Sequence, residues 1–383
     1  MRLEFSPNEL REAINVVMRT ASTRSTIEAL SCILIRAEEN AVRFYSYNLE
    51  CGSIVRVKAD IFEEGAVAVQ ARLFQDIVRK LPNENVSLST NDDQNKLQIV
   101  CGFSKFEIPF LRSDDFPEMP RLEISEREGC IRIPEKVLAE MIHQTLFSAA
   151  SDNTRRLFNS LFFNFKEDCL DVVALDGYRL AFAKYHFNEE QLKAMGDVKQ
   201  YSVVIPAESM AQLAPIMDAK EDEEAYFELS SAKNKVCFEN PNIKIISSTF
   251  EGEYVDYQSL IPNEYLSQFT INRHEFLAAL DRALLMRPAT GRLLPVRFQV
   301  EEGNAGHIKI ESATELGTMK DQVAINFSGE YFDIDFNPTY FTQALKAISD
   351  DEILIRCNGV HGPLTIAPTE GDAYLYLLLP VRR

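Results

Sequence analysis

The sequence has no tryptophan and no closely spaced cysteines. Its seven cysteines are odd in number, and no two of them lie within four positions of each other. A zinc knuckle, a redox pair or a secreted disulfide framework needs paired or clustered spacing. We therefore expect the cysteines to be reduced, buried and used as small apolar side chains; they are Cys32, Cys51, Cys101, Cys130, Cys169, Cys237 and Cys357.

Long hydrophobic runs are missing as well. No stretch of 18 apolar residues occurs, and the N-terminal MRLEFSPNELREAI is charged throughout, without the apolar core of a secretion signal. The chain is expected to be cytoplasmic. Because 46% of its 383 residues are hydrophobic, it has enough apolar material to fold, and its length suits two or three domains.

Motifs for chemistry are also missing. The five histidines form no HxH, HExxH or HxxxH array, and no GxxxxGK[ST], GxGxxG or GxSxG occurs. We therefore predict no catalytic residue, no metal and no cofactor. Acidic clusters at 221–224 and 350–352 leave open a different class of function, a divalent-metal nuclease. Both clusters directly follow predicted helices, where solvated loop charge is the simpler interpretation.

What the sequence does contain is a repeat. Six times, an apolar residue that ends an extended segment is followed by apolar residues five and nine positions later. The last two members of each triplet are four apart, which places them on one face of a helix. Residues suited to a helix start stand beside five of the anchors, as in Ser6-Pro7 and Asn337-Pro338, whereas Gln70-Ala71 lacks this signal. The triplets are Phe5, Leu10, Ile14; Val69, Phe74, Val78; Ile133, Leu138, Ile142; Ile205, Met210, Ala214; Ile271, Phe276, Leu280; and Phe336, Phe341, Leu345.

Between these helices the sequence alternates β-branched and aromatic residues in short segments separated by turns. Each half-repeat thus predicts one helix and about four strands, and two halves make one domain. Short turns between strands favour antiparallel sheets. We predict an α+β chain of three domains, at 1–126, 127–262 and 263–383. A solenoid is disfavoured because the unit is too long and too rich in strands.

The positive charge is concentrated in the helices. The net charge of −18 would normally argue against nucleic acid. The six predicted helical segments nevertheless carry a net +5, which leaves −23 for the strands and loops. If the helices line one surface, that surface can face phosphate with weak, sequence-independent contacts. The alternative, that these are ordinary solvated helix charges, stays open at this point.

Helix packing distances show whether the predicted helices could enclose a DNA duplex. Two copies of the chain would supply twelve helices, which at a spacing of about 10 Å form a circle about 38 Å across between axes. Subtracting one helix diameter leaves an opening of roughly 28 Å, enough for a B-form duplex and water. Six helices from one copy would leave too little, so a dimer is predicted.

One segment carries a family resemblance. VALDGYRLAFA (173–183) predicts a hairpin, with Asp176-Gly177 suited to a type I′ turn. It also resembles the TDGHRLA signature of the bacterial DNA polymerase III beta subunit, the sliding clamp. Further matches follow the same order: DDFPEMP (114–120), RRLFNSLFF (155–163), FNPTYFTQALKAI (336–348) and LYLLLPVRR (375–383). The resemblance covers the whole chain.

The resemblance implies a head-to-tail dimeric ring with a groove between the second and third domains that receives short linear peptides. Apolar pockets would take aromatic or leucine anchors, and Arg179 with backbone groups would fix the peptide. The implied groove residues are Phe158, Leu175, Gly177, Tyr178, Arg179, Leu180, Leu260, His361, Pro363, Leu377, Leu379, Pro380, Val381 and Arg382. The chain departs from the family at Leu175, Val255, Ser259 and its terminal Arg382-Arg383, and these departures bear on peptide preference.

The resemblance also implies partners and further contacts. The partners are double-stranded DNA, a clamp loader, the replicative polymerase and other proteins with clamp-binding peptides. The expected DNA contacts are Arg24, Arg72, Arg79, Lys80 and Arg155, and the expected dimer contacts pair Phe106 and Ile108 with Leu285 and Met286. A third hypothesis is a peptide-binding scaffold without DNA, which would keep the groove but show no topological retention.

Overall fold

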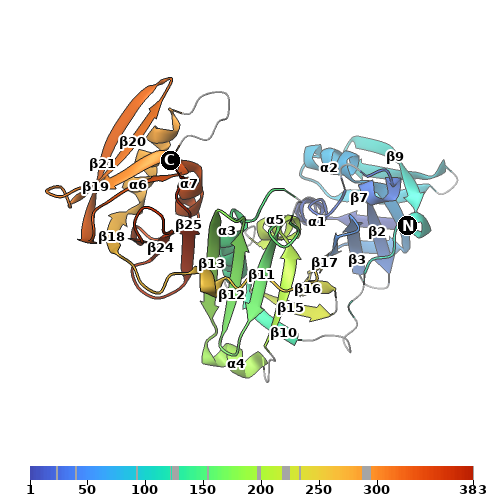
Figure 1. Cartoon of the computed structure of the whole chain (residues 1–383). Coiled ribbons are helices and arrows are strands. Elements are labelled where there is room, and N and C mark those ends of the chain that lie inside the picture. The colour runs from blue at the N-terminus through green and yellow to red at the C-terminus, as the bar shows by residue number, and fades with distance from the viewer. Residues whose placement is uncertain are drawn as a thin grey trace. The chain divides into compact units, whose positions relative to one another are not determined.

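The computed structural model describes residues 1–22, 25–38, 41–91, 94–120, 122, 129–152, 155–195, 200–217, 225–232, 234–286 and 295–382. The chain divides into two compact units (Figure 1). Unit 1 comprises Met1–Ala139, Lys193–Lys199 and Glu208–Thr249, and unit 2 comprises Glu140–Leu192, Gln200–Ala207 and Phe250–Arg383. Each unit is described separately below.

Unit 1 is built on one antiparallel sheet with the strand order β10-β15-β16-β17-β4-β3-β2-β6-β9-β8-β7-β1-β5. Helices α1 (Pro7–Val17) and α2 (Ala71–Lys80) pack against each other in this unit. The strands are β1 (Arg2–Phe5), β2 (Cys32–Glu38), β3 (Ala41–Tyr47), β4 (Cys51–Val57), β5 (Asp60–Glu63), β6 (Gly65–Gln70), β7 (Val86–Asn91), β8 (Lys96–Cys101), β9 (Ser104–Arg112), β10 (Gly129–Pro134), β15 (Tyr226–Ala232), β16 (Lys235–Glu239) and β17 (Ile243–Ser248).

Unit 2 holds a second antiparallel sheet, in the order β14-β11-β12-β13-β25-β24-β23-β18-β21-β20-β19-β22. Helices α6 (Arg273–Leu284) and α7 (Pro338–Lys346) lie side by side in it (Figure 1). The strands are β11 (Ser160–Phe165), β12 (Cys169–Leu175), β13 (Arg179–His186), β14 (Tyr201–Pro206), β18 (Ser267–Asn272), β19 (Val296–Val300), β20 (His307–Thr314), β21 (Gly317–Gly329), β22 (Phe332–Phe336), β23 (Glu352–Cys357), β24 (Leu364–Pro368) and β25 (Tyr374–Leu378).

Helices α3 (Glu135–Leu146), α4 (Glu189–Met195) and α5 (Ala207–Met217) contain three of the five points at which the chain passes between the units. The short α4 has no counterpart in the six-fold repeat, so the sequence pattern missed it. The predicted α+β class with antiparallel sheets is confirmed. No helix of the described ranges is long and apolar enough to cross a membrane.

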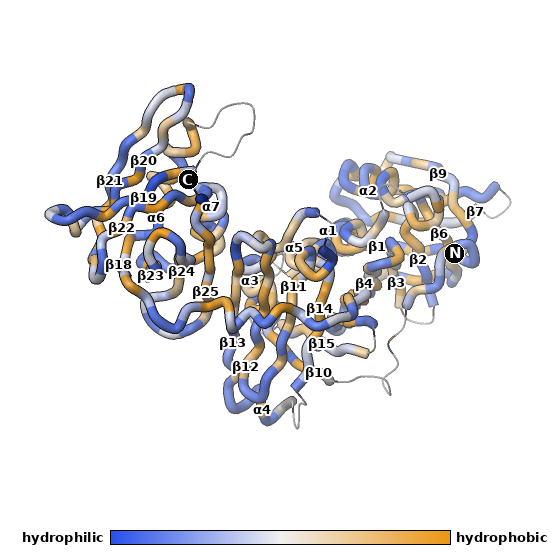
Figure 2. Tube along the Cα trace, in the orientation of Figure 1, coloured by the Kyte–Doolittle hydropathy of each residue, from blue (hydrophilic) through white to orange (hydrophobic). Residues whose placement is uncertain are grey.

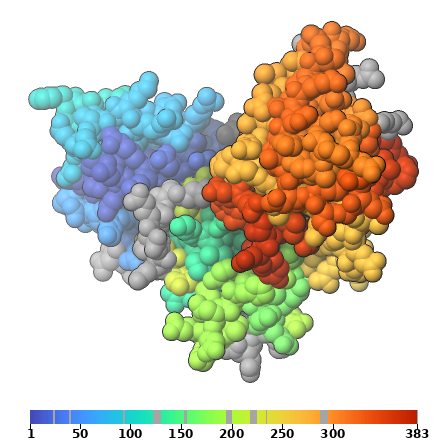
Figure 3. All heavy atoms as spheres, turned by 90° about the vertical axis from the view of Figure 1, so that its left-hand side faces the viewer, coloured from blue at the N-terminus to red at the C-terminus, as the bar shows by residue number. Residues whose placement is uncertain are grey.

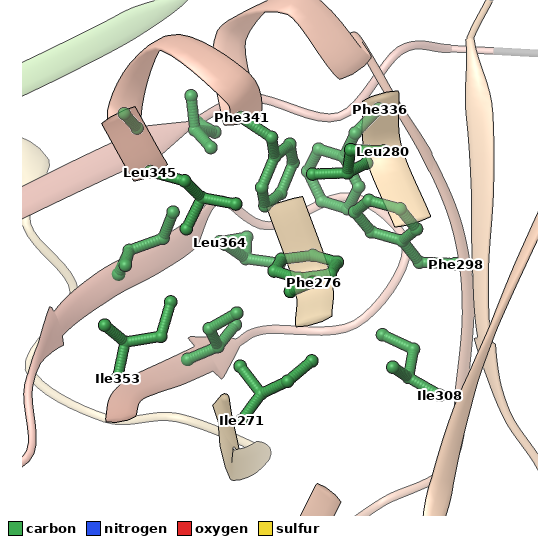
Figure 4. Packing of buried hydrophobic residues seen from close by; sticks show 14 of the residues in the cluster. Ile271, Phe276, Leu280, Phe298, Ile308, Phe336, Phe341, Leu345, Ile353 and Leu364 are labelled. Carbon is green, nitrogen blue, oxygen red and sulfur yellow. The ribbon is translucent and has the colours of Figure 1, made fainter. Parts of the chain in front are cut away.

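The six repeat triplets form the core of both units. Every anchor stands within the last two residues of a strand, and its two partners lie on the helix that follows. All eighteen side chains are at most 2% exposed. In unit 2 the ring of Phe276 contacts those of Phe298 and Phe341, with centroids 5.6 and 5.8 Å apart (Figure 4). The repeat is therefore a packing pattern: each strand end and the next helix bury the same three positions.

The predicted helix starts are confirmed, with one correction. Ser6, Asn272 and Asn337 cap α1, α6 and α7 through their side-chain oxygens. The sequence showed no such signal for α2, yet the Gln70 side chain accepts a hydrogen bond from the backbone N–H of Leu73 at 2.5 Å. Glutamine, one carbon longer than asparagine, thus serves the same capping purpose here.

In each unit, one strand pairing joins strands that lie far apart in the sequence. In unit 1, β4 pairs with β17, and in unit 2, β13 pairs with β25. Hydrophobic residues, orange in Figure 2, gather along the strands. The face of unit 2 turned to the viewer in Figure 3 is covered mainly by orange residues from the segment that contains β19 to β21.

The expectation that all cysteines are buried is wrong at one position. Cys130 on β10 is exposed because β10 is the edge strand of the unit 1 sheet. The other six are buried. Burial raises the pKa of the Cys51 thiol to about 12, which fits an apolar rather than a reactive role.

Candidate functional site

The DGYR segment forms the turn between β12 and β13. Asp176 N–H donates to Arg179 O at 3.2 Å, and Asp176 Oδ1 accepts from the N–H groups of Tyr178 and Arg179 at 2.9 and 3.0 Å. Gly177 has a φ of +91°. The type I′ prediction is wrong, since it needs positive φ at both Asp176 and Gly177, and of these two only Gly177 has it. The aspartate acts through its side chain, which closes the turn.

An apolar cluster lies on the sheet directly below this turn. Leu175, Leu180 and Leu377 form one cross-strand row over β12, β13 and β25. Together with Val173, Phe182 and Tyr257 they make a buried cluster, against which Phe158, Phe162, Tyr254, Val255 and Leu375 pack. The structure therefore brings together four of the predicted groove residues: Phe158, Leu175, Leu180 and Leu377.

Three large apolar side chains stand exposed around this cluster. Tyr178 is 64% exposed, Leu260 45% and Leu379 40%. Leu379 N–H donates to Tyr178 O at 2.9 Å, so the C-terminal segment is held against the turn, and Val381 N–H donates to Asp335 O at 2.7 Å. These three residues and the four clustered groove residues lie next to the turn at 176–179, and we call the seven together the 176–179 surface. Its members are Phe158, Leu175, Tyr178, Leu180, Leu260, Leu377 and Leu379. Such exposed apolar side chains over an apolar floor suit a docked apolar ligand.

Arg179 has a different environment from the one expected of a ligand-binding side chain. It is buried, and its Nε donates to Asp176 Oδ2 at 3.0 Å. Its Nη atoms donate to Gln343 Oε1 on α7 and to Phe147 O after α3. The guanidinium also lies over the Tyr340 ring, 4.4 Å from its centroid. Arg179 thus joins the hairpin to two helical segments and positions the turn.

A buried carboxylate holds the segment that carries Leu260. Asp171 is buried on β12, and its Oδ2 accepts hydrogen bonds from Tyr257 Oη at 2.7 Å and Lys166 Nζ at 2.5 Å. The Tyr257 ring packs against Phe162 and Phe182. Burial, followed by the hydrogen bond to Asp171, raises the pKa of Tyr257. The sequence analysis missed this pair, although a lone aspartate within the apolar CLDVVAL was a usable signal.

The other predicted groove residues lie at the margins. His361 is exposed in the turn between β23 and β24, and Pro363, half-buried, directly precedes β24. Pro380 and Val381 are half-buried and Arg382 is exposed in the C-terminal segment. Of the family departures, Val255 packs against the apolar cluster, and the Ser259 hydroxyl donates to Asp256 O at 2.8 Å.

The predicted DNA contacts are exposed where they are described. Arg72, Arg79 and Lys80 lie on the outer side of α2. Arg155 is exposed and places its guanidinium 5.3 Å from the centroid of the Phe158 ring, next to the 176–179 surface. Arg24 lies outside the described residues.

Some of the helical positive charge is used within the chain. Arg11 Nη2 on α1 donates to Leu81 O, just after α2, at 2.7 Å. Arg273 on α6 likewise donates to Leu345 O and Asp350 O, and Arg282 pairs with Asp321. Two of these arginines therefore satisfy helix C-terminal carbonyls, which reduces the charge available to an external phosphate.

The predicted dimer contacts differ in exposure. Phe106 on β9 is 39% exposed and Leu285, after α6, is 73% exposed, while Met286 is half-buried. Ile108 shares a face of β9 with Phe106 but is only 5% exposed, although both lie opposite fully buried residues of β8, Leu97 and Ile99 respectively. Ile108 therefore belongs to the core of unit 1, and Phe106 is the residue available at the surface.

The acidic residues considered for a nuclease are engaged with neighbours. Asp350 Oδ2 accepts from Tyr374 Oη at 2.7 Å, and Glu352 Oε1 from Thr270 Oγ1 at 3.1 Å. Asp351 Oδ1 lies 3.1 Å from His274 Nε2. Across the described part of the chain, no group of three or more His, Cys, Asp or Glu is placed to hold a metal ion. The cluster at 221–224 lies outside the described residues.

Three family models cover nearly the whole chain. They are the N-terminal, central and C-terminal domains of the DNA polymerase III beta subunit, and they match residues 1–120, 132–256 and 258–382. The chain belongs to the DNA polymerase III beta subunit family. It is a DNA sliding clamp of three clamp domains, a processivity factor without catalytic activity of its own.

Relatives and solved structures agree with this assignment. The beta sliding clamps of Staphylococcus epidermidis and Staphylococcus aureus are 32% and 31% identical over 379 residues, which is 96% of each chain. The sliding clamp from Bacillus subtilis has a TM-score of 0.90 at 28% identity and covers 100% of this chain and 99% of its own. A Bartonella birtlesii clamp bound to griselimycin has a TM-score of 0.88 at 26% identity, with 100% of both chains covered.

Proposed function

We propose that this clamp binds short linear peptides of its partner proteins at the 176–179 surface. The observation that carries the proposal is the exposure of Tyr178, Leu260 and Leu379 around the cluster of Leu175, Leu180 and Leu377. Aromatic or leucine anchors of a peptide would bury these side chains, and each fully buried side chain contributes about 1.5–3 kcal/mol. The partners would be the clamp loader, the replicative polymerase and other proteins with such peptides.

Within this proposal Arg179 is a positioning residue. Its guanidinium is engaged by Asp176, Gln343 and Phe147 O, and it therefore sets the position of the turn that carries Tyr178. The peptide would instead meet apolar side chains and the margins formed by Gly177, His361, Pro363, Pro380, Val381 and Arg382.

A peptide-binding assay tests the surface directly. The probe is a fluorescein-labelled peptide from the replicative polymerase of the source organism, chosen to carry leucine and phenylalanine anchors. Leu379→Ser should weaken its binding at least tenfold, because an apolar contact is lost and a hydroxyl is buried in its place. The control is Leu316→Ser, which changes another exposed leucine, between β20 and β21. Equal affinity of both variants would remove the 176–179 surface as the binding site.

We further propose that two copies close head to tail into a ring around duplex DNA, with domain boundaries at 126/127 and 262/263. Phe106 and Leu285 support the dimer, since both are large apolar side chains exposed on the single chain. Arg72, Arg79, Lys80 and Arg155 support DNA contact through their exposed positive charge, and Arg24 remains a candidate from the sequence.

Retention on nicked circular DNA tests the ring. With the matched clamp loader and ATP, the clamp should stay on the circle and be lost when the circle is cut. Retention that survives cutting would indicate ordinary surface binding, and no retention would leave only the scaffold hypothesis. Arg79→Ala/Lys80→Ala should reduce the slope of log K for DNA binding against log salt concentration by about one or two, because one or two fewer counterions are released. Lys58→Ala, an exposed lysine after β4, is the matched control.

A further inference from the structure

A second hairpin in unit 1 repeats the backbone of the 176–179 turn, 128 positions earlier. Asn48 N–H donates to Cys51 O at 3.1 Å, as Asp176 N–H does to Arg179 O. Asn48 Oδ1 accepts from the N–H groups of Glu50 and Cys51 at 3.0 and 2.7 Å. Leu49 has a φ of +77°, where Gly177 has +91°. The two turns are therefore built in the same way.

The strands around the two turns are in the same register. Tyr47, Gly52 and Ile246 form a cross-strand row on β3, β4 and β17. This row occupies the same register positions as Leu175, Leu180 and Leu377 on β12, β13 and β25. The next strand is also held alike, since Ser248 N–H donates to Glu50 O at 2.8 Å and Leu379 N–H to Tyr178 O at 2.9 Å. We call the Tyr47, Gly52 and Ile246 row the 48–51 surface.

What covers the two surfaces is different. A Cβ atom added to Gly52 would lie 2.5 Å from Met119 Cε and 3.0 Å from Tyr47 Cδ2, so the Met119 side chain fills the space that a side chain at position 52 would take. Three residues later, Leu122 is 7% exposed and packs in a buried cluster with Ile246. On the 176–179 surface, Leu260 follows Tyr257 by the same three residues but is 45% exposed.

We propose that the 48–51 surface is a second peptide-binding site of the same kind, closed by this chain's own Met119 and Leu122. The inference rests on the proposed function of the 176–179 surface. The occupant of the opened site would be a short linear peptide with flexible, unbranched or leucine anchors. Met119 and Leu122 show this preference themselves, because they are the side chains that the surface accepts in the folded chain.

The closure explains why one chain would bind one peptide. An intramolecular segment is present at a high effective concentration, so a free peptide with similar contacts cannot displace it at ordinary concentrations. Removing its two anchors should expose the row and let a peptide bind in trans. The wild-type chain should therefore bind one labelled polymerase peptide, and Met119→Ala/Leu122→Ala should bind two.

Titration of the labelled polymerase peptide, with stoichiometry as the readout, separates this inference from the proposed function. Two peptides per chain in the double variant, one of them weakened at least tenfold when Leu379→Ser is added, supports both. One peptide per chain in the double variant, weakened at least tenfold by Leu379→Ser, overturns the second site and leaves the proposed function intact. No binding even to the wild-type chain overturns the proposed function itself.

A second variant covers the case in which the double variant does not fold. Gly52→Leu introduces the leucine that Leu180 supplies in the other surface, and it collides with the end of the flexible Met119 side chain. The variant should expel Met119, raise its rate of oxidation by dilute hydrogen peroxide at least tenfold and bring the stoichiometry to two. An unchanged oxidation rate, or a raised rate with one peptide bound, overturns the proposal. Gly306→Leu, where no atom lies within 4 Å, is the matched control.

Discussion

The Asn48–Cys51 and Asp176–Arg179 turns share their hydrogen bonds and their register but not their surroundings. In the first, the chain's own Met119 and Leu122 cover the neighbouring row of side chains. In the second, Tyr178, Leu260 and Leu379 remain exposed. The backbone of the repeat therefore does not decide where a partner can dock. Docking depends on the residue that follows the turn on the next strand, Gly52 or Leu180. It also depends on the chain segment beside that residue, which carries Met119 and Leu122 in the first case and Leu260 in the second.

The fourth residue of each turn shows a second difference. Cys51 is buried with Ser209 as a side-chain hydrogen-bond partner, whereas Arg179 at the equivalent position joins the turn to Gln343 and Phe147. A thiol makes only weak hydrogen bonds, while a buried guanidinium makes several strong ones. The second turn is consequently held by stronger long-range polar bonds at this position than the first.

The largest expected effect is at this pair of positions. Arg179→Ala should destabilise the hairpin by about 3 kcal/mol, because Asp176 Oδ2 and the Phe147 carbonyl lose the guanidinium that donates to them. Cys51→Ala should cost about 1 kcal/mol, mainly through lost packing. Hydrogen exchange of the β13 and β4 amides measures both. Equal losses at the two positions would contradict the distinct roles assigned to the two side chains.

The next largest effect concerns the chain segments that lie beside the two surfaces, which carry Tyr257 and Met119. Tyr257→Phe keeps the ring but removes the hydrogen bond to the buried Asp171, which should cost about 2 kcal/mol and weaken peptide binding by loosening the segment that carries Leu260. Met119→Leu, its counterpart over the 48–51 surface, should cost less than about 1.5 kcal/mol. Thermal unfolding and the labelled-peptide assay check the two variants side by side. Unaltered peptide affinity in Tyr257→Phe would show that Tyr257 does not position the surface.

A smaller effect follows from the positive φ angles. Gly177→Ala should cost about 1–2 kcal/mol, because a Cβ atom is disfavoured in the left-handed region. Leu49→Gly, at the same place in the other turn, relieves that strain but frees the unfolded chain, so the net change should stay below about 1 kcal/mol. Urea unfolding measures the difference. A loss in Leu49→Gly as large as that in Gly177→Ala would mean that the Leu49 side chain contributes contacts of its own.

The smallest expected effect is a pH dependence of stability that arises at Asp372, beside β13, and has no counterpart at the equivalent position near the 48–51 surface. Hydrogen bonding to Lys184 on β13, opposed by partial burial and helped by His186, holds the pKa of Asp372 below its ordinary value of 3.8. A lowered pKa in the folded state adds stability above the unfolded value, and this is lost as the pH falls from about 3.8 through the folded pKa. Since Asp372 is half exposed, the contribution should be about 0.5 kcal/mol.

Asp372→Asn tests this by acid unfolding. The variant should be slightly less stable than the wild type at pH 6 and equal to it near pH 2. On the 48–51 side the position equivalent to Asp372 is Pro241, which cannot titrate. A difference between variant and wild type that persists at pH 2 would assign the effect to packing rather than to charge.

Periodicity was the reliable part of the sequence. The spacing of five and four residues predicted all six repeat helices and all eighteen core positions, because helical and extended segments must each place apolar residues on one side. The resemblance likewise placed Phe158, Leu175, Leu180 and Leu377 in one region, and the structure joins them in one cluster. Local pattern and family motif were sufficient for both.

The tertiary structure alone decided which of these residues are available. Ile108 and Phe106 have the same place in the strand pattern of β9, but in the fold Ile108 is 5% exposed and Phe106 39%. The Arg179 guanidinium donates to Gln343 on α7, 164 positions away, and nothing in the sequence indicated this partner. Met119 closes one surface because Gly52 leaves room for it. By itself the sequence determined the repeat, the core and the family, since these depend on spacing along the chain. Exposure and polar partners required the fold, because they depend on residues that are distant in the sequence, such as Arg179 and Gln343.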